Sequence, residues 1–383
     1  MTNATRTEQY TGKAEQVLYL AFELGTKEWK LGFTTDPAAR PRERVIPARQ
    51  LERLRQEIAD AKRWYGLPAA APVRSAYEAG RDGFWLHRSL TADGVHNLVV
   101  DSASIEVNRR QRRAKSDRLD VRKLLTMLLR YHAGEQKVWS VVRVPTPEEE
   151  DRRHLHRELR TLKEERTAVT NRLTGLLANQ GIHLPPGWRH RTLDELLTTR
   201  LWDGSALPPG LRARLQGEWE HVQFLSAKIQ DLERDRQRVL AEQRDPATDK
   251  VRRLLRLRGI GPNGAWVYVH EFFGWRQFGN RKQVGGAAGL TPTPYDTGND
   301  HREQGISKAG NRYIRDVAVE VAWCWLRYQP HSRLTRWYQQ RFAHGGPIAR
   351  KVGVVAVARK LLIELWRFLE HGVIPDGAVL KAA

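Results

Sequence analysis

Cysteine is almost absent from this chain of 383 residues, because Cys324 is the only one. A single cysteine excludes an internal disulfide framework and any zinc site built from several cysteines. Long apolar runs are missing too: no stretch of about 18 apolar residues occurs, so no membrane span is predicted. The chain opens with the polar stretch MTNATRTEQYTGKAEQ, which lacks the apolar core of a signal peptide. We therefore expect an intracellular, cytoplasmic protein.

Negative charge is in short supply. The 44 acidic residues are outnumbered by 65 lysines and arginines, which leaves a formal net charge of +21. Such an excess predicts a polyanionic partner, of which nucleic acid is the commonest. An acidic membrane surface is the alternative, but the positive charge is spread along the chain rather than gathered in one polybasic tail.

The length predicts two or three domains. Residues 17–35 show two apolar, aromatic-rich strands joined by a turn, and residues 48–65 have the apolar spacing of a helix. Further strands are expected around Ala76 and over residues 96–101. Strands that alternate with helices predict an α/β domain over residues 1–145.

A coiled-coil helical region is predicted over residues 146–246, and a mainly helical domain over residues 247–383. Two stretches of the middle region carry apolar residues seven apart, with charged residues around them. These residues are Leu155, Leu162, Val169 and Leu176 in the first stretch, and Leu215, Val222, Ile229, Leu225, Leu232 and Val239 in the second. Proline and glycine between the stretches leave two alternatives open: an antiparallel hairpin within the chain, or pairing with a partner chain.

Four carboxylates stand out by their context. Glu23 ends the apolar run VLYLAFE, and Glu78 follows a short apolar stretch before a glycine. Asp117 and Asp120, in AKSDRLDVRKLL, are three apart and so share one face of a helix. Carboxylates of this kind suit a hard cation such as Mg²⁺, which can assist phosphodiester chemistry. Ordinary surface ion pairs with neighbouring basic residues are the alternative.

The segment NRRQRRAKSDRLD is dense in arginine, as expected of a chain that binds a nucleic-acid backbone. It supplies the candidate contacts Arg109, Arg110, Arg113 and Lys115.

Residues 254–272, LLRLRGIGPNGAWVYVHEF, have the glycine spacing of a helix–hairpin–helix. Gly259 and Gly261 would let backbone amides approach a phosphate closely, with the positive end of the next helix behind them. A corner that serves packing alone explains the same pattern.

Ser307 lies in EQGISKAGNRYIRD, where apolar spacing predicts a helix from Ala309 to Trp325. The serine is therefore a candidate N-cap of that helix. A cap does not explain the cations Lys308, Arg312 and Arg315 that follow, which would surround an anion at the helix N-terminus. The other interpretation is that Ser307 is a nucleophile directed at a phosphate, which would need activation by a base or a metal-bound group.

Three segments together resemble one family: AKSDRLDVRKLL, the hairpin with its following GGAAGLTPTPYDTG, and ISKAGNRYIRD. The chain is similar over nearly its whole length to the DEDD-type insertion-sequence transposases, the bridge-RNA-guided serine recombinases of bacterial mobile elements. The resemblance implies an RNase H-like (RuvC-like) N-terminal domain that holds Mg²⁺ with Glu23, Glu78, Asp117 and Asp120. It further implies a C-terminal domain in which Ser307 attacks DNA and forms a phosphoserine link.

The partners implied by the resemblance are donor and target DNA and an element-encoded guide (bridge) RNA. The resemblance also implies a homo-oligomer, from a dimer to a tetramer, and a location at the bacterial nucleoid. The chain departs from the family at Glu23, where the family usually has aspartate, and the longer side chain shifts the expected metal position. Two other functions stay open: a metal-only nuclease or Holliday-junction resolvase, and a non-catalytic nucleic-acid-binding protein.

Overall fold

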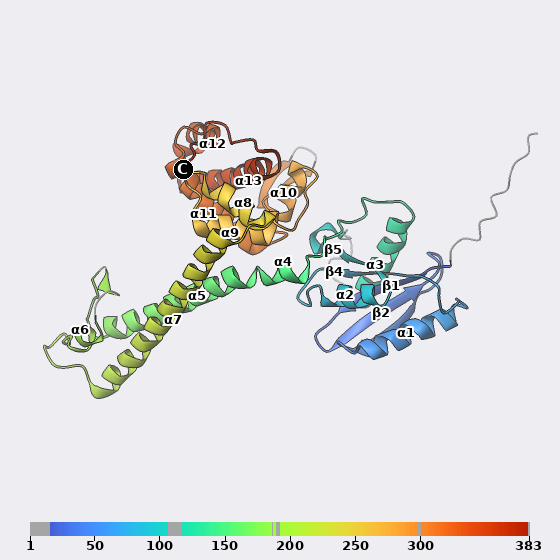
Figure 1. The fold of residues 1–383 in the computed structure, drawn as a ribbon, viewed down its shortest axis with the longest axis horizontal. Coiled ribbons are helices and arrows are strands. Elements are labelled where there is room, and N and C mark those ends of the chain that lie inside the picture. The colour runs from blue at the N-terminus through green and yellow to red at the C-terminus, as the bar shows by residue number, and fades with distance from the viewer. Residues whose placement is uncertain (1–15, 106–116, 186, 189–191, 298–299, 382–383) are drawn as a thin grey trace, which may run out of the picture. The chain divides into compact units, whose positions relative to one another are not determined.

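The computed structural model describes residues 16–105, 117–185, 187–188, 192–297 and 300–381 (Figure 1). The chain divides into two compact units, Met1–Val144 and Pro145–Ala383. The described part of the first unit contains a five-stranded mixed sheet with helices, and that of the second is mostly helical. The fold is therefore mixed α/β, as the sequence predicts. None of the described helices combines the length and the apolar character needed to cross a membrane.

The N-terminal unit is built around the sheet, whose strand order is β3-β2-β1-β4-β5. Strand β1 is antiparallel to β2 and parallel to β4, and β4 is parallel to β5. The elements in chain order are β1 (Leu18–Leu24), β2 (Glu28–Thr34), β3 (Arg42–Pro47), α1 (Leu51–Trp64), β4 (Val73–Glu78), α2 (Trp85–Ala92), β5 (His96–Val100), the 3-10 turn η1 (Ser102–Ser104) and α3 (Asp117–His132). The two strands and turn predicted over residues 17–35 are confirmed as β1 and β2.

Alternation along the strands separates two apolar layers, because successive side chains of a strand point to opposite faces of the sheet. Leu18, Leu20 and Phe22 of β1 pack in one layer with α1 and α2. Ala21 packs in the other layer, with the apolar side of α3. Helix α3 therefore covers one face of the sheet, and α1 and α2 cover the other (Figure 1).

The C-terminal unit gathers α8 to α13 at one end of the long helices α5 and α7, with α6 at the other end (Figure 1). Its elements are α4 (Pro147–Asp151), α5 (His154–Ala178), α6 (Leu193–Leu197), α7 (Pro209–Glu242), α8 (Pro246–Leu255), α9 (Pro262–Tyr268), the π-helical turn η4 (Val269–Phe273), α10 (Arg281–Ala287), β6 (Pro292–Thr297), β7 (Asp300–Ile306), α11 (Arg312–Tyr328), α12 (Arg333–Tyr338), the π-helical turn η5 (Gln339–Ala343) and α13 (Pro347–His371).

Helices α5 and α7 pack against each other along their length, and we call this pair the arm. Lys163 pairs with Glu233 at 2.7 Å, and Arg172 pairs with Glu218 at 3.0 Å, so the two helices run antiparallel. Apolar clusters from both helices fill the space between them. The helices predicted here are confirmed, and they pack within one chain. Pairing of the arm with a second copy stays a prediction.

The structure differs from the sequence-based expectations over residues 291–325 in two respects. The stretch before Ser307 forms the antiparallel hairpin of β6 and β7, which was not predicted. Helix α11 begins at Arg312, three residues after the predicted start at Ala309. The predicted apolar face is confirmed, because Ile314, Val317, Ala318 and Val321 are all buried.

Candidate functional site

Acidic residues stand at the carboxyl ends of three neighbouring parallel strands. Glu23 is the second-last residue of β1, Glu78 is the last residue of β4, and Asp101 follows β5. The pairing of Phe22 with Tyr77 puts Glu23 beside Glu78, because both come next along parallel strands. In open α/β sheets this edge is the usual place for a ligand. Asp101 was missed in the sequence, although HNLVVD has the same form as VLYLAFE: an apolar strand that ends in an acid.

Helix α3 brings Asp117 and Asp120 to the same edge. Its C-terminal residue His132 lies by Tyr19 near the start of β1, with ring centroids 5.9 Å apart. Val121, in its second turn, lies against Gly32, the partner of Ala21 farther along β1. The helix therefore runs opposite to β1, and its first turn lies toward the end at which Glu23 stands. The backbone of Asp117 and Asp120 belongs to this turn, while their side chains lie outside the described part of the structure.

Glu23 and Glu78 also lie on the face of the sheet that α3 covers. Glu23 is two residues from Ala21, and Glu78 is two from Ala76, and both alanines pack in the layer formed with α3. Since alternate residues of a strand share a face, both glutamates belong to the α3 side of the sheet. Carboxylate oxygens suit Mg²⁺, but the described side chains contain no group of three or more that could hold a metal ion. Glu23 and Glu78 supply oxygen donors of the kind that Mg²⁺ prefers, and the side chains of Asp117 and Asp120 lie outside the described part of the structure.

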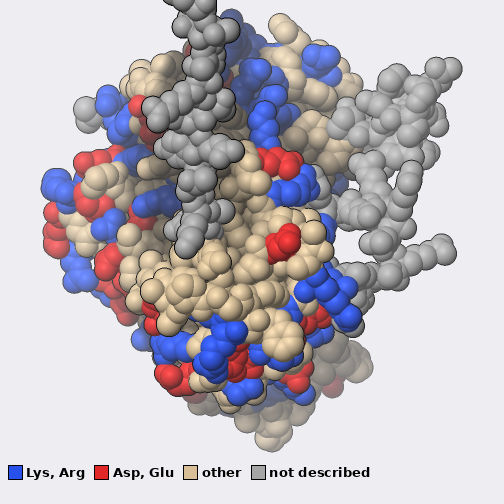
Figure 2. Space-filling model, turned by 90° about the vertical axis from the view of Figure 1, so that its right-hand side faces the viewer, with Lys and Arg blue, Asp and Glu red and all other residues tan. Residues whose placement is uncertain are grey.

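The predicted basic contacts Arg109, Arg110, Arg113 and Lys115 lie outside the described residues. Elsewhere, positive charge is not gathered in one place on the face shown in Figure 2. Lysine and arginine side chains alternate there with acidic ones around a broad uncharged area.

Ser307 does not cap α11. The cap is Asn311, whose side-chain oxygen accepts hydrogen bonds from the backbone N–H groups of Tyr313 at 2.9 Å and Ile314 at 3.4 Å. Ser307 lies four residues earlier, directly after β7, and it is exposed. Its backbone N–H donates to the carbonyl of Thr291 at 2.8 Å. The capping explanation is therefore wrong for Ser307, because a closer Asn with the right backbone geometry takes that place.

The loop that holds Ser307 crosses the end of α10 at very short range. The added Cβ of a residue at Gly289 would lie 1.9 Å from the carbonyl oxygen of Ala309, and one at Gly310 would lie 2.2 Å from that of Ala287. Both glycines also have positive φ, at 66° and 87°. GGAAGL and ISKAGN, which belong to two of the three segments that carried the resemblance, thus form one crossing.

Hydrogen bonds complete this crossing. The N–H of Lys308 donates to the Gly289 carbonyl at 3.1 Å, and Lys308 has the positive φ of 54° that is uncommon outside glycine. Arg315 Nη1 donates to the carbonyl of Lys308 at 3.1 Å and reaches that of Ala288 at 3.5 Å. Arg315 therefore holds the loop backbone.

The three cations near Ser307 differ in their settings. Arg312 is 84% exposed and lies 3.8 Å from Asp316. Lys308 is exposed as well, whereas Arg315 is half-buried against loop carbonyls. Lys308 and Arg312 are accordingly accessible to an anion, and Arg315 acts on the loop.

Gly259 and Gly261 are placed differently from each other. Gly259 has a φ of 82°, and a Cβ there would lie 3.1 Å from the carbonyl oxygen of Cys324 in α11. Close packing against α11 and the positive φ thus explain why this position is a glycine. Gly261, which precedes α9, has open space around its Cβ position.

A buried carboxylate, Glu271, lies behind Asn311 and was also missed. It is 1% exposed and bonds to His156, Arg157 and Asn311. The signal in the sequence was an acid inside the otherwise apolar run WVYVHEFF, because a charge in such a run needs partners.

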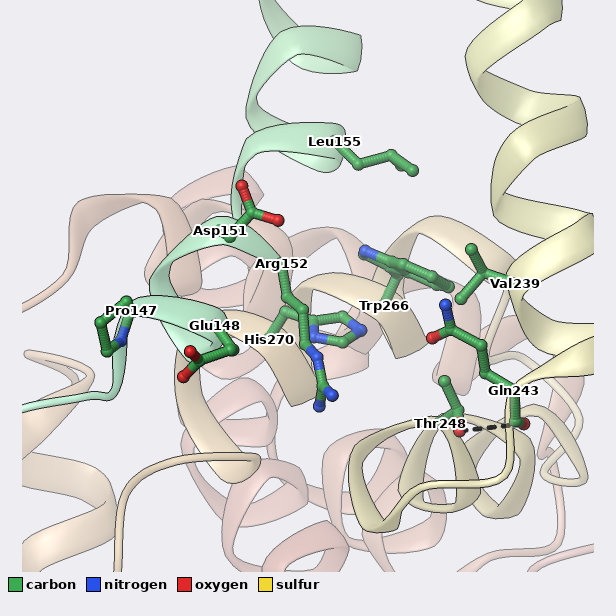
Figure 3. Close-up of a pocket in the computed structure, with 10 residues that line it drawn as sticks. All are labelled: Pro147, Glu148, Asp151, Arg152, Leu155, Val239, Gln243, Thr248, Trp266 and His270. Carbon is green, nitrogen blue, oxygen red and sulfur yellow. Dashed lines mark hydrogen bonds between the residues drawn. The ribbon is translucent and has the colours of Figure 1, made fainter.

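A cavity of about 620 Å³ lies at the base of the arm (Figure 3). Burial lowers the pKa of His270 in its wall to about 3, so this ring is neutral at physiological pH. The Arg152 side chain runs alongside His270 in Figure 3 and binds Asp245 at 3.0 Å. None of the predicted site residues lines this cavity, whose walls are formed by Pro147, Glu148, Asp151, Arg152, Leu155, Val239, Gln243, Thr248, Trp266 and His270.

Residues 251–336 match the family described as the IS116/IS110/IS902 transposases. This range includes both glycine-rich segments, Ser307 and the whole of α11.

Curated relatives agree with the match. The chain is 38% identical over 380 residues to a Sinorhizobium fredii protein that bears the provisional name transposase y4rJ, which covers 95% of this chain and 94% of the relative. It is 28% identical over 237 residues to the transposase for insertion sequence element IS1328 of Yersinia enterocolitica, covering 60% and 66%. A family 20 transposase, provisionally named, of Pseudomonas aeruginosa is 30% identical over 235 residues, again covering 60% and 66%.

Proposed function

Since the chain belongs to the IS116/IS110/IS902 family of transposases, we propose that it cuts and rejoins DNA through a phosphoserine intermediate on Ser307. Its substrates are the donor and target DNA of an insertion sequence. The observation that carries the proposal is an exposed serine on a loop that crosses residues 287–289 closely, followed in the chain by the exposed Lys308 and Arg312.

The reaction exchanges one phosphodiester for another. The Ser307 hydroxyl gives up its proton and its oxygen forms a bond to phosphorus, while the bond from phosphorus to one deoxyribose oxygen breaks and that oxygen takes up a proton to become a free hydroxyl. A hydroxyl of a second DNA end then attacks the phosphoserine, rejoins the strand and releases the serine. Lys308 and Arg312 balance the negative charge of the phosphate during both steps.

Mg²⁺ is proposed as the cofactor, held by Glu23, Glu78, Asp117 and Asp120 in an RNase H-like N-terminal domain. Support comes from the mixed sheet, from the two glutamates on one face at one edge, and from the first turn of α3 near that edge. When bound, the cation would activate the serine hydroxyl and stabilise the leaving oxygen. The carboxylates and Ser307 must meet on one phosphate, within one chain or between two copies.

Guidance by an element-encoded RNA is the further part of the proposal. It rests on the resemblance and on a net charge of +21, which suits a second polyanion beside DNA. Binding of that RNA by the purified protein, with cleavage directed to sites that pair with it, is the expected result.

The decisive experiment incubates the protein with its RNA, donor and target DNA, and Mg²⁺, and then seeks a DNA–protein adduct that survives denaturation. Adduct is expected from the unaltered protein and from a Ser205→Ala control, in which a distant exposed serine is changed. Ser307→Ala should form none. Adduct from Ser307→Ala would refute the assignment, cleavage without adduct would indicate a metal-only nuclease, and binding without cleavage would indicate a non-catalytic protein.

A further inference from the structure

Glu271 is a fully buried carboxylate that links three separate parts of the C-terminal unit. It lies in η4, and its oxygens bind two residues of α5: Arg157 Nε and Nη2 at 2.5 and 3.0 Å, and His156 Nε2 at 2.9 Å. Its third partner is Asn311 Nδ2 at 3.3 Å, at the start of α11. One carboxylate thus joins the base of the arm to the N-terminus of α11.

The ionisation of this group is fixed by its partners. Burial alone would raise the pKa of Glu271, but the hydrogen bonds from His156 and Arg157 outweigh burial and lower the pKa to about 2. Burial lowers the pKa of His156, which is therefore neutral and donates its Nε2 hydrogen to the carboxylate. The linkage consequently stays one carboxylate with one guanidinium across the physiological range.

Asn311 uses both ends of its amide at once. Its oxygen caps α11, and its nitrogen donates to Glu271. Its backbone N–H donates to the Ala287 carbonyl at 3.3 Å, within the same crossing that fixes the loop of Ser307. Loss of the contact with Glu271 would therefore be felt at the helix cap and at the loop together.

Further side chains of α5 contact the N-terminal end of α11. The ring of His156 stacks on that of Tyr313 with centroids 5.9 Å apart, and the guanidinium of Arg160 lies 4.4 Å from the centre of the Tyr313 ring. Arg160 also reaches Asp316 at 3.9 Å. Residues 156, 157 and 160 share one face of α5, so this face of the arm contacts the start of α11 directly and through Glu271.

We propose that Glu271 is a positioning residue: through Asn311 it couples the arm formed by α5 and α7 to the loop that presents Ser307. The proposal rests on the proposed function of Ser307. Engagement of the arm by a nucleic acid or a second copy would thereby set the position of the serine hydroxyl. No contact of Glu271 with DNA is required.

The test compares Glu271→Gln with Glu218→Gln. Glu218 of α7 binds Arg172 of α5 through both of its oxygens, so it links the two helices of the arm without a contact to α11 and is the matched control. Glu271→Gln should speed amide hydrogen exchange in residues 307–314 and slow adduct formation, each by about tenfold or more, because a hydrogen-bonded charge is lost. DNA affinity should change by less than about twofold, since the binding surface is untouched. Glu218→Gln should leave both rates unchanged.

A reversal of the hydrogen bond provides the rescue. Asn311→Asp keeps a good cap but sets two carboxylates against each other, and it should slow adduct formation. In the double variant Glu271→Gln, Asn311→Asp, the glutamine amide can donate to the aspartate, so the rate should rise above that of both single variants. A purely structural loss would not be reversed in this way.

The outcomes separate the two proposals. Unchanged exchange at residues 307–314 in Glu271→Gln overturns the coupling, whether or not adduct forms. Equal effects of Glu218→Gln, or a double variant that is worse than both singles, overturn it too. Lack of adduct in the unaltered protein instead refutes the function of Ser307, and the exchange experiment still decides whether the coupling exists.

Discussion

The two regions that hold the candidate residues position them by opposite means. At the sheet edge, Glu23 and Glu78 stand at the ends of regular strands, and strand pairing alone brings them side by side. Ser307 stands in an irregular loop whose place is fixed by the crossing with residues 287–289 and by Arg315. The end of a regular strand tolerates a changed side chain. The loop, in contrast, depends on close backbone contacts at Gly289 and Gly310, where no side chain fits.

This difference predicts where the molecule is fragile. The carboxylates that we propose as metal ligands stand at strand ends, so their loss should affect the reaction more than stability. Glycines at the crossing carry the fold of the loop, so their loss should affect both.

The largest effect is expected from Gly289→Ala. The new Cβ would lie 1.9 Å from the Ala309 oxygen at a position with positive φ, so the loop must move. We expect the free energy of unfolding to fall by about 3–5 kcal/mol, the sum of steric strain and backbone strain. Adduct formation should be lost with it. Urea denaturation and the adduct assay provide the measurement.

Gly286→Ala is the control for that substitution, since it lies three residues away in α10, exposed, with open space around its Cβ position. Alanine there should stabilise the helix by up to about 1 kcal/mol. Similar stability for Gly289→Ala and Gly286→Ala would show that the crossing does not constrain the loop.

The next effect is expected at the sheet edge. Glu78→Gln keeps the shape of an exposed side chain but removes the charge of a proposed Mg²⁺ ligand, so strand cleavage in Mg²⁺ should fall by about a hundredfold. The free energy of unfolding should change by less than about 1 kcal/mol. Cleavage of labelled donor DNA, before and after chelation of the cation, measures this.

Glu52→Gln, on the exposed face of α1, is the matched control and should cleave DNA normally. Undiminished cleavage in the presence of a chelator would remove Mg²⁺ from the mechanism. Normal cleavage by Glu78→Gln would remove only that residue.

The same difference determines which features of the two regions could be predicted from the sequence. Strands β1, β4 and β5 were predictable because apolar runs ending in an acid are local signals, and the faces follow from a period of two. Strand pairing depends on contacts between distant parts of the chain, so only the structure shows that Glu23 and Glu78 lie side by side. The hairpin of β6 and β7 was missed because prolines in TPTPY argue against strands, although a two-stranded hairpin tolerates them at its edges.

In the C-terminal unit, the choice between Ser307 and Asn311 as the cap could not be made locally. Both are good N-cap residues, and both precede the same apolar spacing. What decides is tertiary: the backbone of Ser307 pairs with Thr291, and Gly310 crosses Ala287, so the helix can begin only after Asn311. Two of the three partners of Glu271 come from α5, more than a hundred residues earlier, and no local pattern joins them.

The smallest effect separates the two arginines beside Ser307. Arg312 is exposed and makes only a weak contact with Asp316, so Arg312→Ala should leave stability unchanged within about 0.5 kcal/mol. If Arg312 binds a phosphate, the slope of the logarithm of DNA affinity against the logarithm of salt concentration should become shallower by about one.

Arg315→Ala should behave in the opposite way. Its guanidinium holds the loop carbonyls, so its loss should slow adduct formation while the salt dependence of DNA binding stays the same. An unchanged slope for Arg312→Ala, or a changed slope for Arg315→Ala, would reverse the two roles. Arg312 would then support the loop, and Arg315 would bind the phosphate. The exposure of an arginine side chain would in that case not identify the one that binds DNA at this site.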